Sequence, residues 1–387
     1  MSGVTIAARI DEVNGRSSGF DYLRILLAFG VVVYHTLLTT YGLDAEDEFV
    51  SGVFHPLIAL ILPCFFALSG FLVAGSLERS RNLAEFLALR VLRIFPALSA
   101  EILLSALLVG PAVTSLAWKD YFSDPLFFRY FFNIVGHVQF KLPGAFDSNP
   151  FPQIVNGQLW TVPFELECYI ALSVMTLIGA VRYRYVLLLL VAGLNLAFVA
   201  KNIISPPIVG VHGVLTGRQL VMTFFYGVMI YRFKDKLVWS SWAFAICALA
   251  SVALLWRQST ACDYLALPFI AYVTAYLGLT DPKRLLIVKI GDLSYGVFLY
   301  SFTIQQLVVH LGAKQWWTNL LATIPLCLLF ALFSWTCVEK PFLGFRKHLV
   351  KLDPLVDFCT TTFGRFIDLV TKKRTSLPPG GERLADG

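Results

Sequence analysis

Two ionisable side chains, Arg24 and His35, lie within the otherwise apolar stretch 20–38, which is hydrophobic enough to enter a bilayer. A charge among lipid tails costs at least about 2.5–3.5 kcal/mol, so such groups usually face a protein interior or a water-filled cavity. Their spacing of eleven residues corresponds to about 16 Å along a helix and keeps them on nearly the same face. The pattern predicts that both groups enter one cavity. The alternative is that Arg24 snorkels to the membrane boundary and His35 only satisfies a backbone carbonyl.

Two more arginines, Arg90 and Arg93, are three residues apart, which places them on one helix face near the end that we predict to be cytoplasmic. Each guanidinium presents a rigid fork of donors that suits phosphate oxygens. The pair therefore predicts a phosphate site. The alternative is a pair of cationic membrane anchors.

Carboxylates also occur at membrane depth. Glu165 and Glu167 are two residues apart near the start of a predicted helix, so they lie on different faces and only one is expected to face a cavity. Pro163 is compatible with this helix because the first turn tolerates proline. Glu101 lies within another apolar segment, where we expect it to serve packing or an ion pair.

The amino-acid composition is that of a membrane protein. Hydrophobic residues make up 57% of the 387 positions and charged residues only 14%, against about 25% charged residues in soluble domains. We therefore expect an all-α polytopic integral membrane protein with about ten transmembrane helices. The predicted spans are 20–41, 53–75, 86–110, 158–180, 185–203, 218–233, 238–256, 262–280, 290–312 and 317–338.

Basic residues are concentrated in alternate loops. If the N-terminus is cytoplasmic, the inner loops receive the basic clusters, whereas the first outer loop is the acidic run 44–48. This asymmetry fits the positive-inside rule for an even number of spans, with both termini in the cytoplasm. The net charge of +6 then reflects topology, and no nucleic-acid partner is needed to explain it.

The chain divides into a cytoplasmic N-terminal segment over 1–19, a transmembrane domain over 20–345 and a cytoplasmic C-terminal tail over 346–387. Residues 1–19 lack the pattern of a cleaved signal peptide. The seven cysteines have no metal-ligand spacing, so we expect them to pack in the core and expect no metal site. The aromatic loop 111–157 is expected either to cover a cavity mouth or to anchor at the membrane interface.

Six sequence motifs follow one another along the chain. They are Arg24 with His35 (R-x10-H), CFFALSGFL at 64–72, RVLRIFP at 90–96, LWTVPFELECY at 159–169, SYGVFLY at 294–300 and VEKP at 338–341. In this order they resemble the acyltransferase 3 membrane proteins, bacterial O-acyltransferases that modify surface polysaccharides and related glycans. The resemblance covers nearly the whole membrane region.

The resemblance implies that a cytoplasmic acyl-coenzyme A, most often acetyl-coenzyme A, donates the acyl group, with no tightly bound cofactor. His35 would be the base that takes a proton from the acceptor hydroxyl, a role suited to histidine near neutral pH. Glu165 would be the second catalytic residue, either orienting His35 or binding the acceptor. The remaining predicted residues of the donor and substrate sites are Arg24, Arg90, Arg93, Ser69, Gly70, Trp160 and Tyr169. For Ser69 and Gly70, close helix packing is the alternative.

The chain departs from the family pattern in one span. Many relatives have a histidine where this chain has Ser301 within LYSFTI at 299–304. Serine can only donate or accept a hydrogen bond near neutral pH, which leaves His35 as the principal group for proton transfer.

The expected acceptor is a glycan or lipid-linked saccharide, and the expected location is the bacterial inner membrane, in contact with lipid. The sequence leaves open whether the acyl group crosses the membrane on His35 or through direct attack by the acceptor. A proton-coupled secondary transporter or flippase is the alternative function, with His35 and Glu165 as its proton relay.

Overall fold

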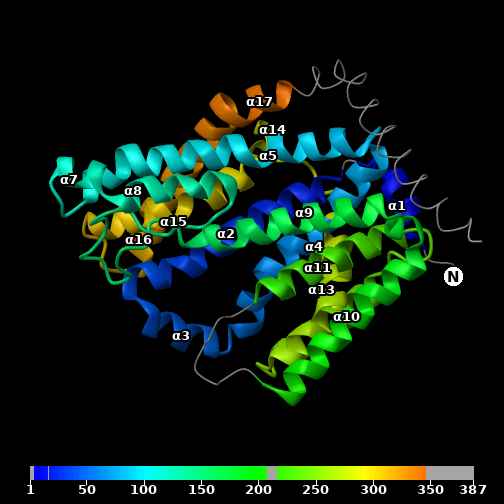
Figure 1. Ribbon diagram of the computed structural model, residues 1–387. Helices are drawn as coiled ribbons and strands as arrows, with labels where there is room; N and C mark the ends of the chain where they lie inside the picture. The colour runs from blue at the N-terminus through cyan, green and yellow to red at the C-terminus, as the bar shows by residue number, and fades with distance from the viewer. Residues whose placement is uncertain (1–3, 16, 207–215, 346–387) are drawn as a thin grey trace, which may run out of the picture.

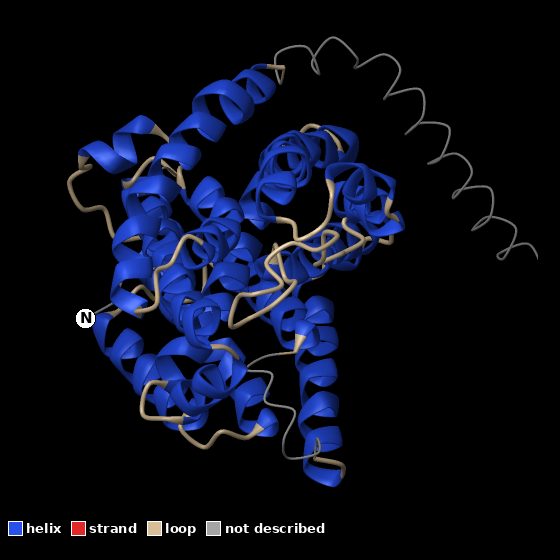
Figure 2. Cartoon of the chain, turned by 90° about the vertical axis from the view of Figure 1, so that its left-hand side faces the viewer, coloured by secondary structure: helices blue, strands red, loops and turns tan. Residues whose placement is uncertain are grey.

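The computed structural model describes residues 4–15, 17–206 and 216–345, and these residues form helices joined by loops, with no β-strand (Figure 2). The α-helices are α1 (Ile6–Glu12), α2 (Ser18–Tyr41), α3 (Leu43–Ser51), α4 (His55–Arg79), α5 (Leu83–Leu104), α6 (Gly110–Val113), α7 (Trp118–Ser123), α8 (Pro125–Tyr130), α9 (Val162–Leu177), α10 (Arg184–Ile204), α11 (Gly217–Arg232), α12 (Ser241–Leu255), α13 (Thr260–Gly278), α14 (Leu286–Ile290), α15 (Ser294–His310), α16 (Trp316–Phe333) and α17 (Lys340–Gly344). Short 3₁₀ or π turns are η1 (Ser105–Val109), η2 (Phe131–Val135), η3 (Gly157–Thr161), η4 (Ala180–Arg182) and η5 (Ser334–Glu339).

Each of the ten predicted spans overlaps one of the longer helices. These are α2, α4, α5, α9, α10, α11, α12, α13, α15 and α16. Within the described residues, six helical segments are long and apolar enough to cross a membrane: Ser18–Tyr41, His55–Arg79, Leu83–Val113, Arg184–Ile204, Thr260–Gly278 and Trp316–Gly344. The helices α9, α11, α12 and α15 have 15 to 17 residues each. The all-α membrane fold is therefore confirmed, whereas the count of ten crossings stays a prediction.

The core is built around the pair α4 and α11, which make the most extensive helix contact. A Cβ atom added at Gly70 would lie 2.0 Å from the carbonyl oxygen of Phe224, and one added at Gly227 would lie 2.1 Å from that of Ala67. The two glycines therefore allow the backbones to touch, as small residues do in membrane helix pairs. Around this pair, α13 packs on both helices and α2 joins α4 to α15.

Two long helices contain π turns, η1 after α5 and η5 after α16. Such turns widen the helix locally and often occur at functional sites. Glu339 closes η5 and is almost fully buried.

Glu101 lies one turn before η1 and is fully buried, where it accepts hydrogen bonds from Ser105 Oγ (2.6 Å), Asn156 Nδ2 (2.8 Å) and Thr303 Oγ1 (3.2 Å). Of the two expected roles, packing or an ion pair, the ion pair is not observed, because these neutral donors hold the carboxyl group. They join α5 to α15 and to the loop before η3.

The short helices lie at opposite ends of the bundle, with α1 at one end and α7 and α8 at the other (Figure 1). At the first end, backbone hydrogen bonds from Ile6 to Leu237 (2.9 Å) and from Trp239 to Val4 (2.8 Å) fix the N-terminal segment to the turn after α11. The predicted C-terminal tail, 346–387, lies outside the described residues.

Candidate active site

One cavity, of about 140 Å³, lies among α2, α4, α5, α9 and α15. Its polar wall consists of Arg24, Ser69, Arg90, Arg93, Thr161, Glu165, Tyr169, Ser294 and Tyr295. We call it the arginine cavity. It brings together three arginines that the sequence places in two motifs.

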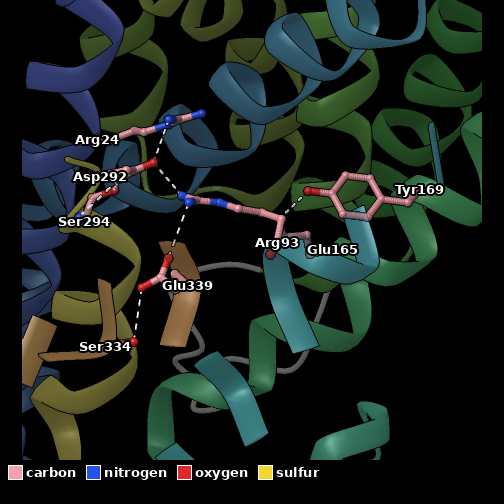
Figure 3. A network of polar contacts seen from close by, with 8 residues as sticks. All are labelled: Arg24, Arg93, Glu165, Tyr169, Asp292, Ser294, Ser334 and Glu339. Atoms are coloured by element: carbon pink, nitrogen blue, oxygen red, sulfur yellow. Dashed lines mark hydrogen bonds and ion pairs between the residues drawn. The ribbon is translucent and has the colours of Figure 1, made fainter. Parts of the chain in front are cut away.

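Arg24 and Arg93 are already paired with carboxylates (Figure 3). Asp292, in the loop before α15, accepts from Arg24 Nη1 at 2.9 Å and from Arg93 through the same Oδ2 atom. Arg93 also lies 3.4 Å from Glu339 Oε2. Serines support both carboxylates: Ser294 donates to Asp292, and Ser334 donates to Glu339. The network ties α2, α5, η5 and the loop before α15 together.

Arg90 has a different environment. Its Nη2 donates to Ser76 Oγ at 3.0 Å, while its buried Nε has no hydrogen-bond partner among the described residues. The guanidinium carbon lies 6.0 Å from the ring centroid of Tyr169, whose hydroxyl donates to Glu165 Oε1 at 2.5 Å. Within the described chain, Arg90 forms no ion pair, so it has donors to offer an anionic ligand.

A second cavity, of about 440 Å³, contains His35. Its wall also includes Tyr34, Glu46, Phe140, Phe151, Gln158, Trp160 and Phe302. We call it the histidine cavity. The histidine cavity lies beside α3, which contributes Glu46 to its wall. Phe140 and Phe151 in the same wall come from loop 111–157, which agrees with the expectation that this loop covers a cavity mouth.

The His35 side chain is buried, and it has a ring nitrogen that is free to take part in a reaction. Only 8% of the residue is exposed, and its ring centroid lies 5.1 Å from that of Phe302 and 5.2 Å from that of Tyr34. Nδ1 is buried without a hydrogen-bond partner in the described part of the chain. Gln158 Oε1 is likewise unpartnered there, although its amide nitrogen donates to the Leu299 carbonyl at 2.5 Å. Aromatic rings thus position a basic nitrogen, and the cavity wall carries a free amide oxygen.

The two cavities are adjacent, because Leu62, Thr161 and Phe298 line both. We call these three residues the septum. The prediction that Arg24 and His35 enter one cavity is therefore wrong. They share a helix face, but they lie about 16 Å apart along the helix, and each lines a different cavity. Leu62 from α4 and Phe298 from α15 line both cavities.

Comparison with known proteins now identifies the family. A family model described as an acyltransferase domain, Acyl_transf_3, matches residues 17–339. The chain belongs to this acyltransferase 3 family. It is similar to an O-acetyl transferase of Shigella phage Sf6, with 26% identity over 345 residues that cover 87% of this chain and 99% of the relative. It is also similar to nodulation protein 10 of Rhizobium leguminosarum bv. viciae, with 27% identity over 372 residues, covering 88% and 97% of the two chains. No solved structure matches.

The protein is accordingly a membrane O-acyltransferase. Its two carboxylates on α9, Glu165 and Glu167, lie on different helix faces, as their spacing predicts. Glu165 lines the arginine cavity, whereas Glu167 is half-exposed and pairs with Arg218. Glu165 therefore lies in a different cavity from His35, which does not fit a role in orienting His35 directly. Trp160 and Thr161 reach the histidine cavity, and the next helical turn carries Glu165 past the septum to the arginine side.

The other predicted residues of this acyltransferase divide between the cavities. Ser69 and Tyr169 line the arginine cavity, with their hydroxyl oxygens 3.5 Å apart, and Trp160 lines only the histidine cavity. Gly70 lines neither. Its predicted contact with substrate is replaced by the crossing of α4 and α11, where the Phe224 backbone occupies the space. Ser301 is fully buried outside both cavities and donates to the Phe298 carbonyl at 3.3 Å.

Sequence reasoning missed four residues of the acyltransferase site: Glu46, Gln158, Asp292 and Glu339. A signal existed for Asp292 and Glu339, since an arginine at membrane depth requires a partner. Asp292 lies two residues before the motif at 294–300, and Glu339 lies within the motif at 338–341. Glu46 lies in the acidic run 44–48, which on its own indicates only topology. Gln158 directly precedes a motif, but an uncharged side chain gives no sequence signal of a site.

Proposed function

We propose that this O-acyltransferase moves an acyl group, most readily acetyl, from a cytoplasmic acyl-coenzyme A to a hydroxyl of a surface or exported glycan or lipid-linked saccharide. One observation carries the proposal: a cavity with an available arginine and a cavity with an available histidine meet at a septum of three residues. The name of the phage relative, O-acetyl transferase, supports acetyl as the group transferred.

The donor would bind through Arg90. Arg90 has an unpartnered Nε and forms no ion pair among the described residues, so it is the arginine best able to meet a phosphate. Arg24 and Arg93 would contribute positive potential and position the helices, because each is already paired with a carboxylate. The thioester end of the donor would then point toward the septum.

The reaction would be a direct transfer. His35 takes the proton of the acceptor hydroxyl, and the oxygen attacks the thioester carbonyl carbon, so a C–O bond forms while the C–S bond breaks. The departing sulfur receives the proton from His35 and leaves as the thiol of coenzyme A. Gln158 and Trp160, both in the wall of the histidine cavity, supply a hydrogen-bond acceptor and an aromatic surface for a saccharide.

This arrangement fits a protein of the bacterial inner membrane with both termini in the cytoplasm. The end of the bundle with α1 would face the donor pool, and the end with α7 and α8 would face the acceptor. The clustering of lysine and arginine in alternate loops supports this orientation. The proposed transfer uses no tightly bound cofactor, because the acyl donor and the acceptor are both substrates that bind and leave.

The test is transfer from radiolabelled acetyl-coenzyme A by the full-length protein in bilayer nanodiscs, with glycan from the host envelope as acceptor. We expect label in the glycan and stoichiometric release of the coenzyme A thiol, both lost in His35→Ala. His137→Ala, an exposed histidine outside both cavities, is the matched control and should retain activity. Full transfer by a folded His35→Ala protein would refute the role of His35. Proton-coupled flux of a solute into sealed vesicles that contain the protein, without thiol release, would favour the transporter instead.

A further inference from the structure

The septum has two apolar members and one polar member. Leu62 comes from the third turn of α4 and Phe298 from the second turn of α15, while Thr161 closes η3. Thr161 is 6% exposed and its hydroxyl donates to the Gln158 carbonyl at 3.3 Å. The side chains of Leu62 and Phe298 are partly buried and form the apolar faces that the two cavities share.

Phe298 is held from the arginine side. Its ring meets the ring of Phe65 edge to face, with centroids 6.3 Å apart, and Phe65 lines only the arginine cavity. Leu62 approaches from the opposite helix. Since α2 joins α4 and α15 along their length, the distance between these two side chains is set by helix packing rather than by a mobile loop.

We propose that Leu62 and Phe298 set the length of the acyl chain that the enzyme accepts. This inference rests on the proposed function, in which the thioester reaches the septum from the arginine cavity. The carbonyl carbon must then be accessible to a hydroxyl in the histidine cavity, so the rest of the acyl chain has to lie against these two side chains. An acetyl methyl group fits such a place, whereas each further methylene group requires one of the side chains to move.

The arginine cavity is the smaller of the two, at about 140 Å³, and it must also receive the thioester and the arm that leads to it. It therefore offers a longer acyl chain less room than the histidine cavity does. A longer chain would therefore extend through the septum into the larger histidine cavity, where it would meet the acceptor. Shortening Leu62 or Phe298 should open that path.

The experiment measures binding of acetyl-coenzyme A and hexanoyl-coenzyme A, without an acceptor, to the full-length protein in nanodiscs by calorimetry. We expect the wild type to bind the acetyl donor at least about tenfold more tightly. Phe298→Ala and Leu62→Ala should each reduce this ratio at least about fivefold, mainly by tightening the hexanoyl complex. If Phe298→Ala fails to fold, Phe298→Leu and Leu62→Ala still test the inference.

The matched control is Phe330→Ala. Phe330 lies on α16 in neither cavity and packs against Tyr300 at 5.6 Å between ring centroids, so its loss loosens the same helix bundle without opening the septum. The ratio should stay at the wild-type value. Equal affinities of the wild type for both donors, or an unchanged ratio in the folded septum variants, would overturn the inference. Failure of the wild type to bind acetyl-coenzyme A at all would instead refute the proposed function.

Discussion

Arg93 pairs with Asp292, which fixes α5 to the loop before α15. The same carboxylate oxygen also accepts from Arg24, so one aspartate pairs with two guanidinium groups of two different motifs. Arg93 is therefore a poor phosphate ligand, although it stands three residues from Arg90 on the same helix face. Two arginines that look equivalent in the sequence thus have different environments and, we expect, different tasks.

Loss of the shared carboxylate should destabilise the fold. Asp292→Asn removes the anion that pairs with Arg24 and one of the two that pair with Arg93, and we expect it to lower the free energy of unfolding by about 1–3 kcal/mol. Thermal unfolding of the detergent-solubilised protein measures this. The matched control is Asp235→Asn, which breaks the exposed pair with Arg184 and should leave the melting temperature almost unchanged. Equal effects of the two substitutions would mean that the network has no structural role.

Donor binding should depend on Arg90 far more than on Arg93. We expect Arg90→Gln to raise the Kd for acetyl-coenzyme A at least about tenfold, or about 1.4 kcal/mol, with little change in thermal stability. Arg90→Lys should rescue only part of the affinity, since lysine lacks the planar fork. Arg93→Gln should mainly lower the melting temperature. If folded Arg93→Gln protein loses as much donor affinity as Arg90→Gln, the ion pairs of Arg93 open on binding and the division is wrong.

Glu165 should act on the donor side. It accepts the Tyr169 hydroxyl hydrogen bond and so fixes the ring that lies beside Arg90. We expect Glu165→Gln to weaken donor binding about three- to tenfold while the pH dependence of transfer, which reports His35, keeps its shape. Calorimetry and a pH–rate profile separate the two effects. Glu167→Gln, on the opposite face, is the control and should change neither. A displaced acidic limb in Glu165→Gln would mean that the carboxylate senses His35 through the septum.

The sequence predicts the elements of this fold better than their partners. Apolar runs of suitable length and the R-x10-H motif place Arg24 and His35 on one face of α2, and the structure agrees. Periodicity gives the direction of a side chain from its own helix axis but not the residue of another helix that meets it. Leu62 and Phe298, which separate the two cavities, are more than 200 positions apart and look like ordinary apolar residues.

The same limit explains the missed acidic partners. The charge of Arg93 at membrane depth required an anion, but the acidic residue that supplies it depends on how the loop before α15 and the π turn η5 meet α5. In contrast, the opposed faces of Glu165 and Glu167 follow from helix geometry alone and were predicted correctly. Local geometry was thus readable from the sequence, whereas the division of one expected cavity into two was not.

Glu46 on α3 lines the histidine cavity and accepts a hydrogen bond from the Tyr34 hydroxyl. Burial raises the pKa of this carboxyl group and Asp47 raises it further, while the Tyr34 hydrogen bond opposes them; the net direction is upward from 4.5. The folded protein therefore holds this proton more tightly than the unfolded chain. The resulting stability is fully present below the unfolded pKa and is lost as the pH rises through the folded pKa.

Glu46→Gln removes this titration while it keeps the size of the side chain. We expect the melting temperature of the wild type, relative to that of Glu46→Gln, to fall as the pH rises from 4.5 and then to become constant above the raised pKa. Tyr34→Phe is the informative companion, since it removes the hydrogen bond that favours the carboxylate and should extend the falling range to higher pH. Scanning fluorimetry at half-unit steps from pH 4 to 8 measures both curves. A relative melting temperature that rises with pH would show that Glu46 is held as the anion, with the Tyr34 hydroxyl outweighing the effect of burial.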